Sequence, residues 1–225
     1  MHVGPEAWYF AIGQSALECI QRVLGSVQPS SILDLPSGHG RVLRYLTVEY
    51  PEAEIVACDI DRDGVDFCVE RFGATGVYSE QDPQQIQLGR TFDLIWCGSL
   101  LTHVSEWKPW LDLFHSSLSE DGVLIFSTAG RFVIETIRRG KLGGITADAA
   151  EQVLRDYEAT GFGYADYPGQ RGYGLARAHP SYVLSLLEDF RVVSMIEHEY
   201  AGRQDVYAAT LRPLGRRFRG QPPTE

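Results

Sequence analysis

The segment Ser31–Leu46, SILDLPSGHGRVLRYL, carries the pattern on which the fold of this chain depends. An apolar run ends in the acid Asp34, a turn containing Gly38 and Gly40 follows, and apolar residues then recur at helical spacing. This order predicts a buried strand, a tight turn and a helix. Glycines let the backbone approach a bound molecule closely, and amides at a helix N-terminus attract a polar or negative group. The segment is therefore a candidate ligand-binding element, although glycine is also common in ordinary strand-to-helix turns.

The length and charge of the chain limit the classes of function. The 225 residues suit one domain with a single core, and no linker rich in Pro, Gly or Ser divides them. The formal net charge is −10, whereas binding to nucleic acid or to an anionic membrane requires a basic surface. We therefore expect a small-molecule partner, with no nucleic-acid partner and no membrane partner.

The cysteines and the apolar segments predict a cytoplasmic location. The N-terminus lacks a basic stretch followed by an apolar one, and no apolar run approaches the roughly 20 residues that span a bilayer. Reduced thiols suit the cytosol. A disulfide framework or a metal site is not expected, because neither a CxxC pair nor a series of metal-ligand spacings is formed by Cys19, Cys58, Cys68 and Cys97.

The first helix is predicted over residues 6–24, where apolar residues recur every three or four positions. Aromatic residues at helical spacing are more often core than ligand contacts, so we expect Trp8 and Phe10 in the core. Tyr9 has two possible roles: it packs in the core, or it covers a ligand bound at the glycine turn.

After the glycine turn, strands and helices alternate. Residues 54–59, EIVACD, predict a second buried strand that again ends in an acid, Asp59, and a helix follows with Asp61 as its N-cap and Gly73 as its end. Such alternation favours a parallel sheet. The pattern continues with strands at 76–79, 92–97 and 123–128, and with a helix beginning at Ser105 or Glu106.

The last third of the chain departs from this alternation. Two strands at 190–198 and 205–211 have no helix between them, which predicts an antiparallel pair at the sheet edge. The arginine-containing tail from 213 to 225 is predicted to be mobile. Helices are predicted at 131–139, 147–159 and 181–188.

Residues 161–178 form a long segment rich in Gly, Tyr and Arg. It is longer than an ordinary connection, and loops of this length are usually functional or disordered. One interpretation is a lid over the acceptor, in which Tyr164, Arg171 and Tyr173 bind the substrate. The other is a well-ordered loop whose aromatic residues pack against the sheet edge.

Four motifs in this order resemble those of class I S-adenosylmethionine-dependent methyltransferases, from about Ser31 to Thr128 together with the closing strand pair. The matching stretches are DLPSGHG, ACDID, SEQDP and FDLIWCGSLLTH. Pro36 departs from the pattern, because it stands where the family usually has a first glycine. The resemblance implies an α/β fold: a single Rossmann-like domain over 1–212, with a mostly parallel seven-stranded sheet, an antiparallel last strand, helices on both faces, and an inserted helix and lid-like loop at 141–179.

The resemblance implies S-adenosylmethionine as cofactor and S-adenosylhomocysteine as product. Asp34 would hold the ammonium group, Asp59 would accept hydrogen bonds from both ribose hydroxyls, and Asp82 would accept from the adenine amino group. Turn chemistry before Pro83 is an equal alternative for Asp82. Amides around Ser37, Gly38 and His39 would receive the carboxylate, and His39 would also pack beside the cofactor. The remaining expected cofactor contacts are Gly40, Ile60, Cys97 and Gly98, with core packing as the alternative for Cys97.

The transfer step needs few side chains, because a sulfonium methyl is already activated and the enzyme mainly aligns the reactants. His103, which follows the fourth strand, is the first candidate general base. Its alternative role is a local hydrogen bond that orders the loop. His179 is the second candidate, with helix entry as its alternative role.

The function that this pattern favours is methyl transfer from S-adenosylmethionine to a small-molecule or sugar-like acceptor, at oxygen. A nucleotide (NAD)-dependent oxidoreductase is one alternative, since Gly38 and Gly40 followed by an acid form half of the dinucleotide fingerprint; Leu43, however, stands where that fingerprint has Gly or Ala. The other alternative is a non-catalytic binding module that retains the fold, and Pro36 favours it.

Overall fold

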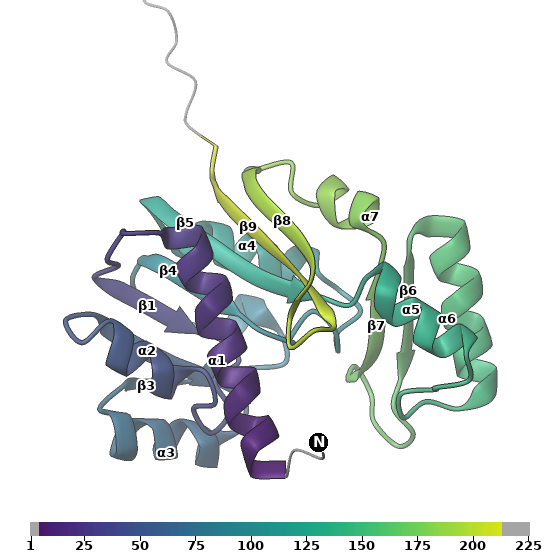
Figure 1. Ribbon diagram of the computed structural model, residues 1–225, viewed down its shortest axis with the longest axis horizontal. Coiled ribbons are helices and arrows are strands. Elements are labelled where there is room, and N and C mark those ends of the chain that lie inside the picture. Colours follow the sequence, from purple (N-terminus) through teal and green to yellow (C-terminus); the bar gives the residue numbers. More distant parts are fainter. Residues whose placement is uncertain (1–4, 213–225) are drawn as a thin grey trace, which may run out of the picture.

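The computed structural model describes residues 5–212, so the tail predicted at 213–225 lies outside the described residues. Nine strands form a seven-stranded sheet and a separate hairpin (Figure 1). The strands are β1 Ser31–Asp34, β2 Glu54–Asp59, β3 Thr75–Tyr78, β4 Phe92–Cys97, β5 Leu118–Thr128, β6 Phe162–Asp166, β7 Gly174–Ala178, β8 Phe190–Tyr200 and β9 Gln204–Leu211. The helices are α1 Pro5–Leu24, α2 Leu43–Glu49, α3 Arg62–Phe72, α4 Lys108–Ser117, α5 Arg131–Arg138, α6 Ala147–Thr160 and α7 Pro180–Ser185, with a 3₁₀ turn, η1, at Pro83–Gln85.

The main sheet has the strand order β3-β2-β1-β4-β5-β9-β8. Strands β1 to β5 pair in parallel, whereas β9 is antiparallel to both β5 and β8. The predicted fold class, a mostly parallel seven-stranded sheet with an antiparallel last strand, is confirmed. The strand order reverses between β1 and β4, and in open α/β sheets ligands bind beside the carboxyl ends of the strands at such a point.

Helices cover both faces of the sheet because successive strand side chains point to opposite sides. Along β1, Ile32 packs in one cluster with α1, α2 and α3, and Leu33 packs in another cluster with α4. All four β1 residues are buried, as expected of a central parallel strand. Because helices cover both faces of the sheet, the polar residues at the strand ends meet at its carboxyl-end edge.

A small lobe lies beside the main sheet, built from α5, α6 and the hairpin of β6 and β7 (Figure 1). It has its own apolar cluster, in which Ile137, Val153 and Leu175 are almost fully buried. The prediction of a loop over residues 161–178 was therefore wrong in its conformation, because most of the segment is an antiparallel hairpin. The residues of β7, GLARA, contain no β-branched or aromatic side chain, so the sequence carried no strand signal there.

Two further predictions need correction. Trp8 and Phe10 are 49% and 46% exposed, because the buried stripe of α1 begins only at Gly13 and Ala16. The helix after the fourth strand begins at Lys108, not at Ser105 or Glu106, and the chain from Cys97 to that helix is a turn-rich segment that lines a cavity.

Candidate functional site

A cavity of about 650 Å³ lies at the carboxyl-end edge of the sheet. It is bordered by residues that follow β1, β2, β3 and β4, by the first turns of α4, and by the tip of the β6–β7 hairpin. Its volume falls in the range of small-molecule sites. The lining residues are Leu35, Ile60, Ser79, Glu80, Gln81, Asp82, Pro83, Leu100, Val104, Ser105, Glu106, Pro109, Trp110, Gln170, Gly172 and Tyr173.

Two acids end the adjacent strands β1 and β2. Asp34 is 1% exposed, and among residues 5–212 neither of its carboxyl oxygens has a hydrogen-bond partner. Burial, and then the negative charge of Asp59, raise the pKa of Asp34 well above its usual range, and the nearby backbone amide of Leu43, which makes no hydrogen bond of normal geometry to it, opposes them only weakly. A buried carboxyl in this condition favours a proton or a cation beside it.

The carboxylate of Asp59 accepts two backbone hydrogen bonds that hold the glycine turn. Its Oδ2 accepts the amide of Gly38 at 2.7 Å, and its Oδ1 accepts the amide of Asp61 at 2.9 Å. Each carboxylate oxygen offers two lone-pair directions, so one direction on each remains for a ligand. Asp59 therefore joins the glycine turn to the start of α3 and keeps acceptor capacity toward a diol.

The glycine turn uses more of its amides internally than the sequence predicted. The amide of Ser37 donates to Cys58, and that of Gly38 donates to Asp59, so neither is free for a carboxylate. Gly40 has a φ of +68°, and a Cβ there would lie 2.7 Å from the ring of Phe72. This glycine is needed because α3 packs tightly beneath the turn.

Two of the residues that were predicted to contact the cofactor, Ile60 and Asp82, line the cavity, and Ile60 is 57% exposed. Asp82 also caps η1, because its Oδ1 accepts the amide of Gln84 at 3.0 Å. Its turn role is thus present in the structure, and its position permits contact with a ligand as well.

His103 belongs to the loop after β4 and contacts the β6–β7 hairpin. Its Nδ1 lies 2.8 Å from the carbonyl oxygen of Gly174, and because a carbonyl only accepts, Nδ1 carries the proton. The Nε2 lone pair of the neutral ring is then available. Burial lowers the pKa of His103, and the nearby Arg177 guanidinium also lowers it, while the bond to Gly174 opposes both effects. The side chain thus makes the hydrogen bond that orders the loop, and its role as general base stays a prediction.

The tip of the β6–β7 hairpin, residues 167–173, contacts His103 through its tyrosines. The ring of Tyr173 stacks on His103 with centroids 5.0 Å apart, and Tyr173 also lines the cavity. Burial raises the pKa of Tyr173, and the negative charge of Asp59 raises it further. The hydroxyl of Tyr167 lies 3.2 Å from Nδ1 of His103.

Several predicted site residues do not line the cavity. His179 is the N-cap of α7, where its Nδ1 accepts the amide of Ser181. Tyr164 donates to Asp166 at 2.5 Å within the hairpin, and Arg171 is exposed at its tip. Cys97 is fully buried in the core, where burial raises its thiol pKa, and Gly98 sits against the indole of Trp96.

Tyr9 and His39 meet at the outer side of the glycine turn. The Tyr9 hydroxyl donates to the His39 carbonyl at 3.2 Å, and the Arg41 guanidinium lies over the Tyr9 ring. The imidazole of His39 faces Asp63, with Nε2 and Oδ2 3.0 Å apart. Tyr9 therefore braces the turn, and the His39 side chain contacts the start of α3.

The sequence did not predict the apolar wall of the cavity. Leu100, Val104 and Trp110 form much of this wall, yet each follows a pattern that is ordinary for core. For Leu100 and Val104, the position in the loop after β4 was the available signal. Tyr167 and Arg177 were expected to offer a hydroxyl and a charged donor within residues 161–178, but their place near His103 was not predicted, because the strands of the hairpin were not recognised.

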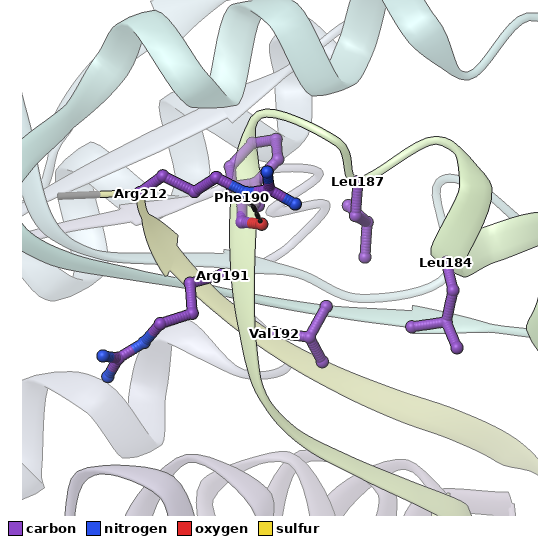
Figure 2. A pocket seen from close by; sticks show the side chains of 6 residues that line it. All are labelled: Leu184, Leu187, Phe190, Arg191, Val192 and Arg212. Carbon is purple, nitrogen blue, oxygen red and sulfur yellow. Dashed lines mark hydrogen bonds between the residues drawn. The ribbon is translucent and has the colours of Figure 1, made fainter. Parts of the chain in front are cut away.

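A second hollow, of about 540 Å³, lies at the opposite end of the sheet, and Figure 2 shows the side chains that line it. Phe190 begins the edge strand β8, and Arg212 donates to its carbonyl at 3.0 Å. Because β8 runs parallel to β5, this hollow is at the amino-terminal edge of the sheet, away from the acid pair. It contains none of the predicted site residues.

Neither a metal centre nor a membrane span is found among the described residues 5–212. No group of three or more His, Cys, Asp or Glu side chains is placed to hold a metal ion. No helix in this part of the chain has the length and apolar character needed to cross a bilayer.

The open parallel sheet, its order reversal between β1 and β4, and the acids ending β1 and β2 define a class of α/β domain that binds a nucleoside-containing ligand at its strand ends. Comparison with known proteins specifies the class further. Residues 33–124 match the family described as a methyltransferase domain. This match covers less than half of the chain, and together with the sheet topology it supports a methyltransferase domain of the class I S-adenosylmethionine-dependent type.

Individual relatives agree with this assignment. The malonyl-[acyl-carrier protein] O-methyltransferase of Acetivibrio thermocellus is 29% identical over 124 residues, which cover 52% of this chain and 44% of that protein. The chain thus spans less than half the length of this curated relative. A Pyrococcus horikoshii protein of known structure superposes with a TM-score of 0.62 at 15% identity, covering 91% of both chains. The 1,6-didemethyltoxoflavin-N1-methyltransferase of Burkholderia thailandensis, solved with S-adenosylhomocysteine, gives 0.63 at 16% identity over 90% of this chain and 79% of that chain. At these identities the structural likeness concerns the fold.

Proposed function

We propose that this protein transfers a methyl group from S-adenosylmethionine to an oxygen atom of a small-molecule acceptor. The observation that carries the proposal is that Asp34, which is buried and unpartnered among residues 5–212, and the nearby Asp59 directly precede Leu35 and Ile60, and these two residues line the cavity of about 650 Å³. The O-methyltransferase named above supports oxygen as the accepting atom, and the neighbour solved with S-adenosylhomocysteine supports the cofactor.

The residues present fit S-adenosylmethionine. Both Asp34 oxygens lack a partner among residues 5–212, so a cationic group at this position satisfies them and compensates the nearby charge of Asp59. Asp59 retains one acceptor direction on each oxygen for the ribose hydroxyls. Ile60 and Asp82 line the cavity beyond β2 and would flank the base. With the amides of Ser37 and Gly38 already engaged, the amide of His39 is the one left in the predicted set for the carboxylate.

The bound cofactor supplies an activated methyl group, and the residues of the chain orient the acceptor and receive its proton. His103 is held by Gly174 so that its Nε2 is the basic nitrogen, and its lowered pKa keeps it neutral near pH 7. His103 does not itself line the cavity but directly precedes Val104, which does, and a neutral imidazole at this position is suited to take a proton from an acceptor hydroxyl. Tyr173 packs on the ring and limits its rotation.

The proposal is tested by turnover. Purified protein is incubated with methyl-labelled S-adenosylmethionine and a panel of hydroxyl, carboxyl and amine compounds, and label transfer and S-adenosylhomocysteine release are measured. We expect acceptor-dependent transfer to an oxygen compound that a His103→Asn variant slows strongly. Transfer only to nitrogen compounds would overturn the choice of atom, and cofactor binding without transfer to any compound would favour a binding module.

A further inference from the structure

Arg177, on β7, is a buried cation without an anionic partner. Its residue is 8% exposed, and its Nε is buried without a hydrogen bond. Within residues 5–212, its one side-chain hydrogen bond runs from Nη1 to the carbonyl of Ala176, at 2.8 Å. Burial lowers the pKa of Arg177 to about 10. Even at that pKa the guanidinium is charged near neutral pH.

The surroundings of Arg177 contain hydroxyl and imidazole groups in place of an acid. Alternation along β7 puts Arg177 on the same side as Leu175, which packs in the lobe. The α5–α6 connection touches Tyr167, since a Cβ at Gly144 would lie 3.3 Å from its ring, and the Tyr167 hydroxyl lies 3.2 Å from Nδ1 of His103. The charge of Arg177 opposes the rise in the pKa of Tyr167 and adds to the fall in the pKa of His103. Gly143 closes over the side chain from the α5–α6 connection, since a Cβ there would lie 3.7 Å from Nη2. The result is a cluster of Arg177, Tyr167, His103 and Tyr173 at the inner side of the hairpin.

A buried arginine without an anionic partner lowers the stability of the free protein. Buried charges are normally paired, and an unpaired one loses hydration without an ion pair in return. The edge of the guanidinium formed by Nε and Nη2 is the one that binds carboxylates with two parallel hydrogen bonds, and here that edge is not used by any acid of the described residues. An anionic ligand would remove the cost, and its place is next to the predicted general base.

We propose that the acceptor carries a carboxylate and that Arg177 binds it, with the hydroxyl of Tyr167 contributing a further donor. This deepens the proposed function, on which it rests for the statement that the bound molecule is the methyl acceptor. The carboxylate site itself is a property of Arg177 and its neighbours and is measured independently of turnover.

The experiment is a calorimetric titration of the protein with malonate and, separately, with its uncharged analogue malonamide, at pH 7.5 and with and without saturating S-adenosylhomocysteine. We expect malonate to bind at least tenfold more tightly than malonamide. An Arg177→Met variant, which keeps the length of the stem, should lose at least tenfold in malonate affinity, and Arg177→Lys should fall between the two because it keeps the charge without the fork. Arg155→Met, on the exposed side of α6, removes the same charge from the same lobe and should bind malonate as the wild type does.

The outcomes separate this proposal from the proposed function. Equal affinity for malonate and malonamide in the unmutated protein, or malonate affinity that is the same in Arg177→Met, would overturn the carboxylate site even if S-adenosylhomocysteine binds. Malonate binding that depends on Arg177, in a protein that does not bind S-adenosylhomocysteine, would support the site and contradict the methyltransferase function. The comparison of malonate with malonamide needs no variant, so it holds even if Arg177→Met folds poorly.

Discussion

Asp34 shows how a single residue relates stability to binding. In the free protein its carboxyl group is buried, close to the charge of Asp59, and without a hydrogen-bond partner among residues 5–212. An unsatisfied buried polar group of this kind costs about 1–3 kcal/mol. A cation at the end of β1 offsets that cost. The residue that destabilises the free domain is thus the one that gives a cationic ligand its largest electrostatic gain.

Replacing Asp34 by Asn is expected to change the pH dependence of stability. Because the folded-state pKa of Asp34 is raised, its contribution to stability is complete below the unfolded pKa and is lost as the pH rises through the folded one. Asp34→Asn should remove that loss, so the free protein should melt at a higher temperature than wild type at pH 8 and show a smaller difference at pH 4. Thermal melts at the two pH values measure this.

Asp93 is a control because the pH dependence of its contribution to stability has the opposite sign to that of Asp34. Its pKa is lowered, first by the Ser30 hydroxyl, which donates to Oδ2 at 2.6 Å, so its stabilising contribution is lost as the pH falls. Asp93→Asn should therefore lower the melting temperature at pH 8. The account of Asp34 is contradicted if Asp34→Asn lowers the melting temperature at pH 8 as Asp93→Asn does.

His103 gives a prediction for the rate of transfer. Burial lowers its pKa below the usual 6.5, so the imidazole stays neutral and able to accept a proton into the weakly acidic range. The value of kcat/KM should be flat near pH 7 and fall only below about pH 6.5. His103→Asn should reduce the rate by about 10²–10⁴-fold, the usual contribution of general-base catalysis, and abolish this acidic limb. A variant that keeps both rate and limb would exclude His103 as the base.

At the scale of elements, the β6–β7 hairpin determines the shape of the acceptor side. Strand β7 is fixed to the main domain by backbone bonds in which the amides of Gly174, Ala176 and Ala178 donate to His103, Thr102 and Ala129. The tip, residues 167–173, contributes Gln170, Gly172 and Tyr173 to the lining of the cavity. Strand β7 is thus ordered against the strand-end loops, and the role of the segment as a lid over the acceptor stays a prediction.

Tyr173→Ala tests the role of the tip. Removing a ring that lines the cavity and stacks on His103 should lower methyl transfer at least tenfold, while S-adenosylhomocysteine affinity and melting temperature stay near wild type. Tyr78, on β3, is a matched control, since it is 44% exposed and Tyr173 is 45% exposed. A lowered melting temperature with unchanged specific activity in Tyr173→Ala would show that the tip only packs.

The elements that sequence could predict are those with a strong local signal. The apolar runs ending at Asp34 and Asp59, and the glycine stop at Gly73, identified β1, β2 and α3 because buried strands and helix caps need these residue types. Strand β7 has no such signal, and it is specified by long-range contacts with Thr102 and His103. The acid pair could be predicted from strand ends, whereas Arg177 could not be placed without the hairpin.

At the scale of the whole molecule, the two sides of the cavity come from different parts of the chain. Segments that follow β1 to β4 line one part of the cavity, and the tip of the β6–β7 hairpin lines another. Under the proposed function the first part would bind the cofactor and the second the acceptor. The lobe has its own apolar cluster. A substitution that loosens the packing of that cluster should therefore weaken acceptor binding more than cofactor binding.

Leu175→Ala tests this division. Leu175 is 2% exposed in the lobe cluster, and a large-to-small change at such a site costs about 2–5 kcal/mol. We expect a lower melting temperature and a raised KM for the acceptor, with S-adenosylhomocysteine affinity near wild type. Leu184→Ala, at a position 45% exposed beside the hollow of Figure 2, should change neither. Equal loss of acceptor and cofactor binding in Leu175→Ala would show that the two sides are not separable.

The central claim, that the acid pair at the strand ends binds S-adenosylmethionine, is tested most directly by titrating S-adenosylhomocysteine and NAD calorimetrically into wild type and Asp59→Ala. Asp59 orders the glycine turn and offers the ribose hydroxyls a charged acceptor. We predict that wild type binds S-adenosylhomocysteine and not NAD, and that a folded Asp59→Ala protein loses about 1.5–3 kcal/mol of that binding. Preference for NAD, or the same S-adenosylhomocysteine affinity in both proteins, would contradict the account.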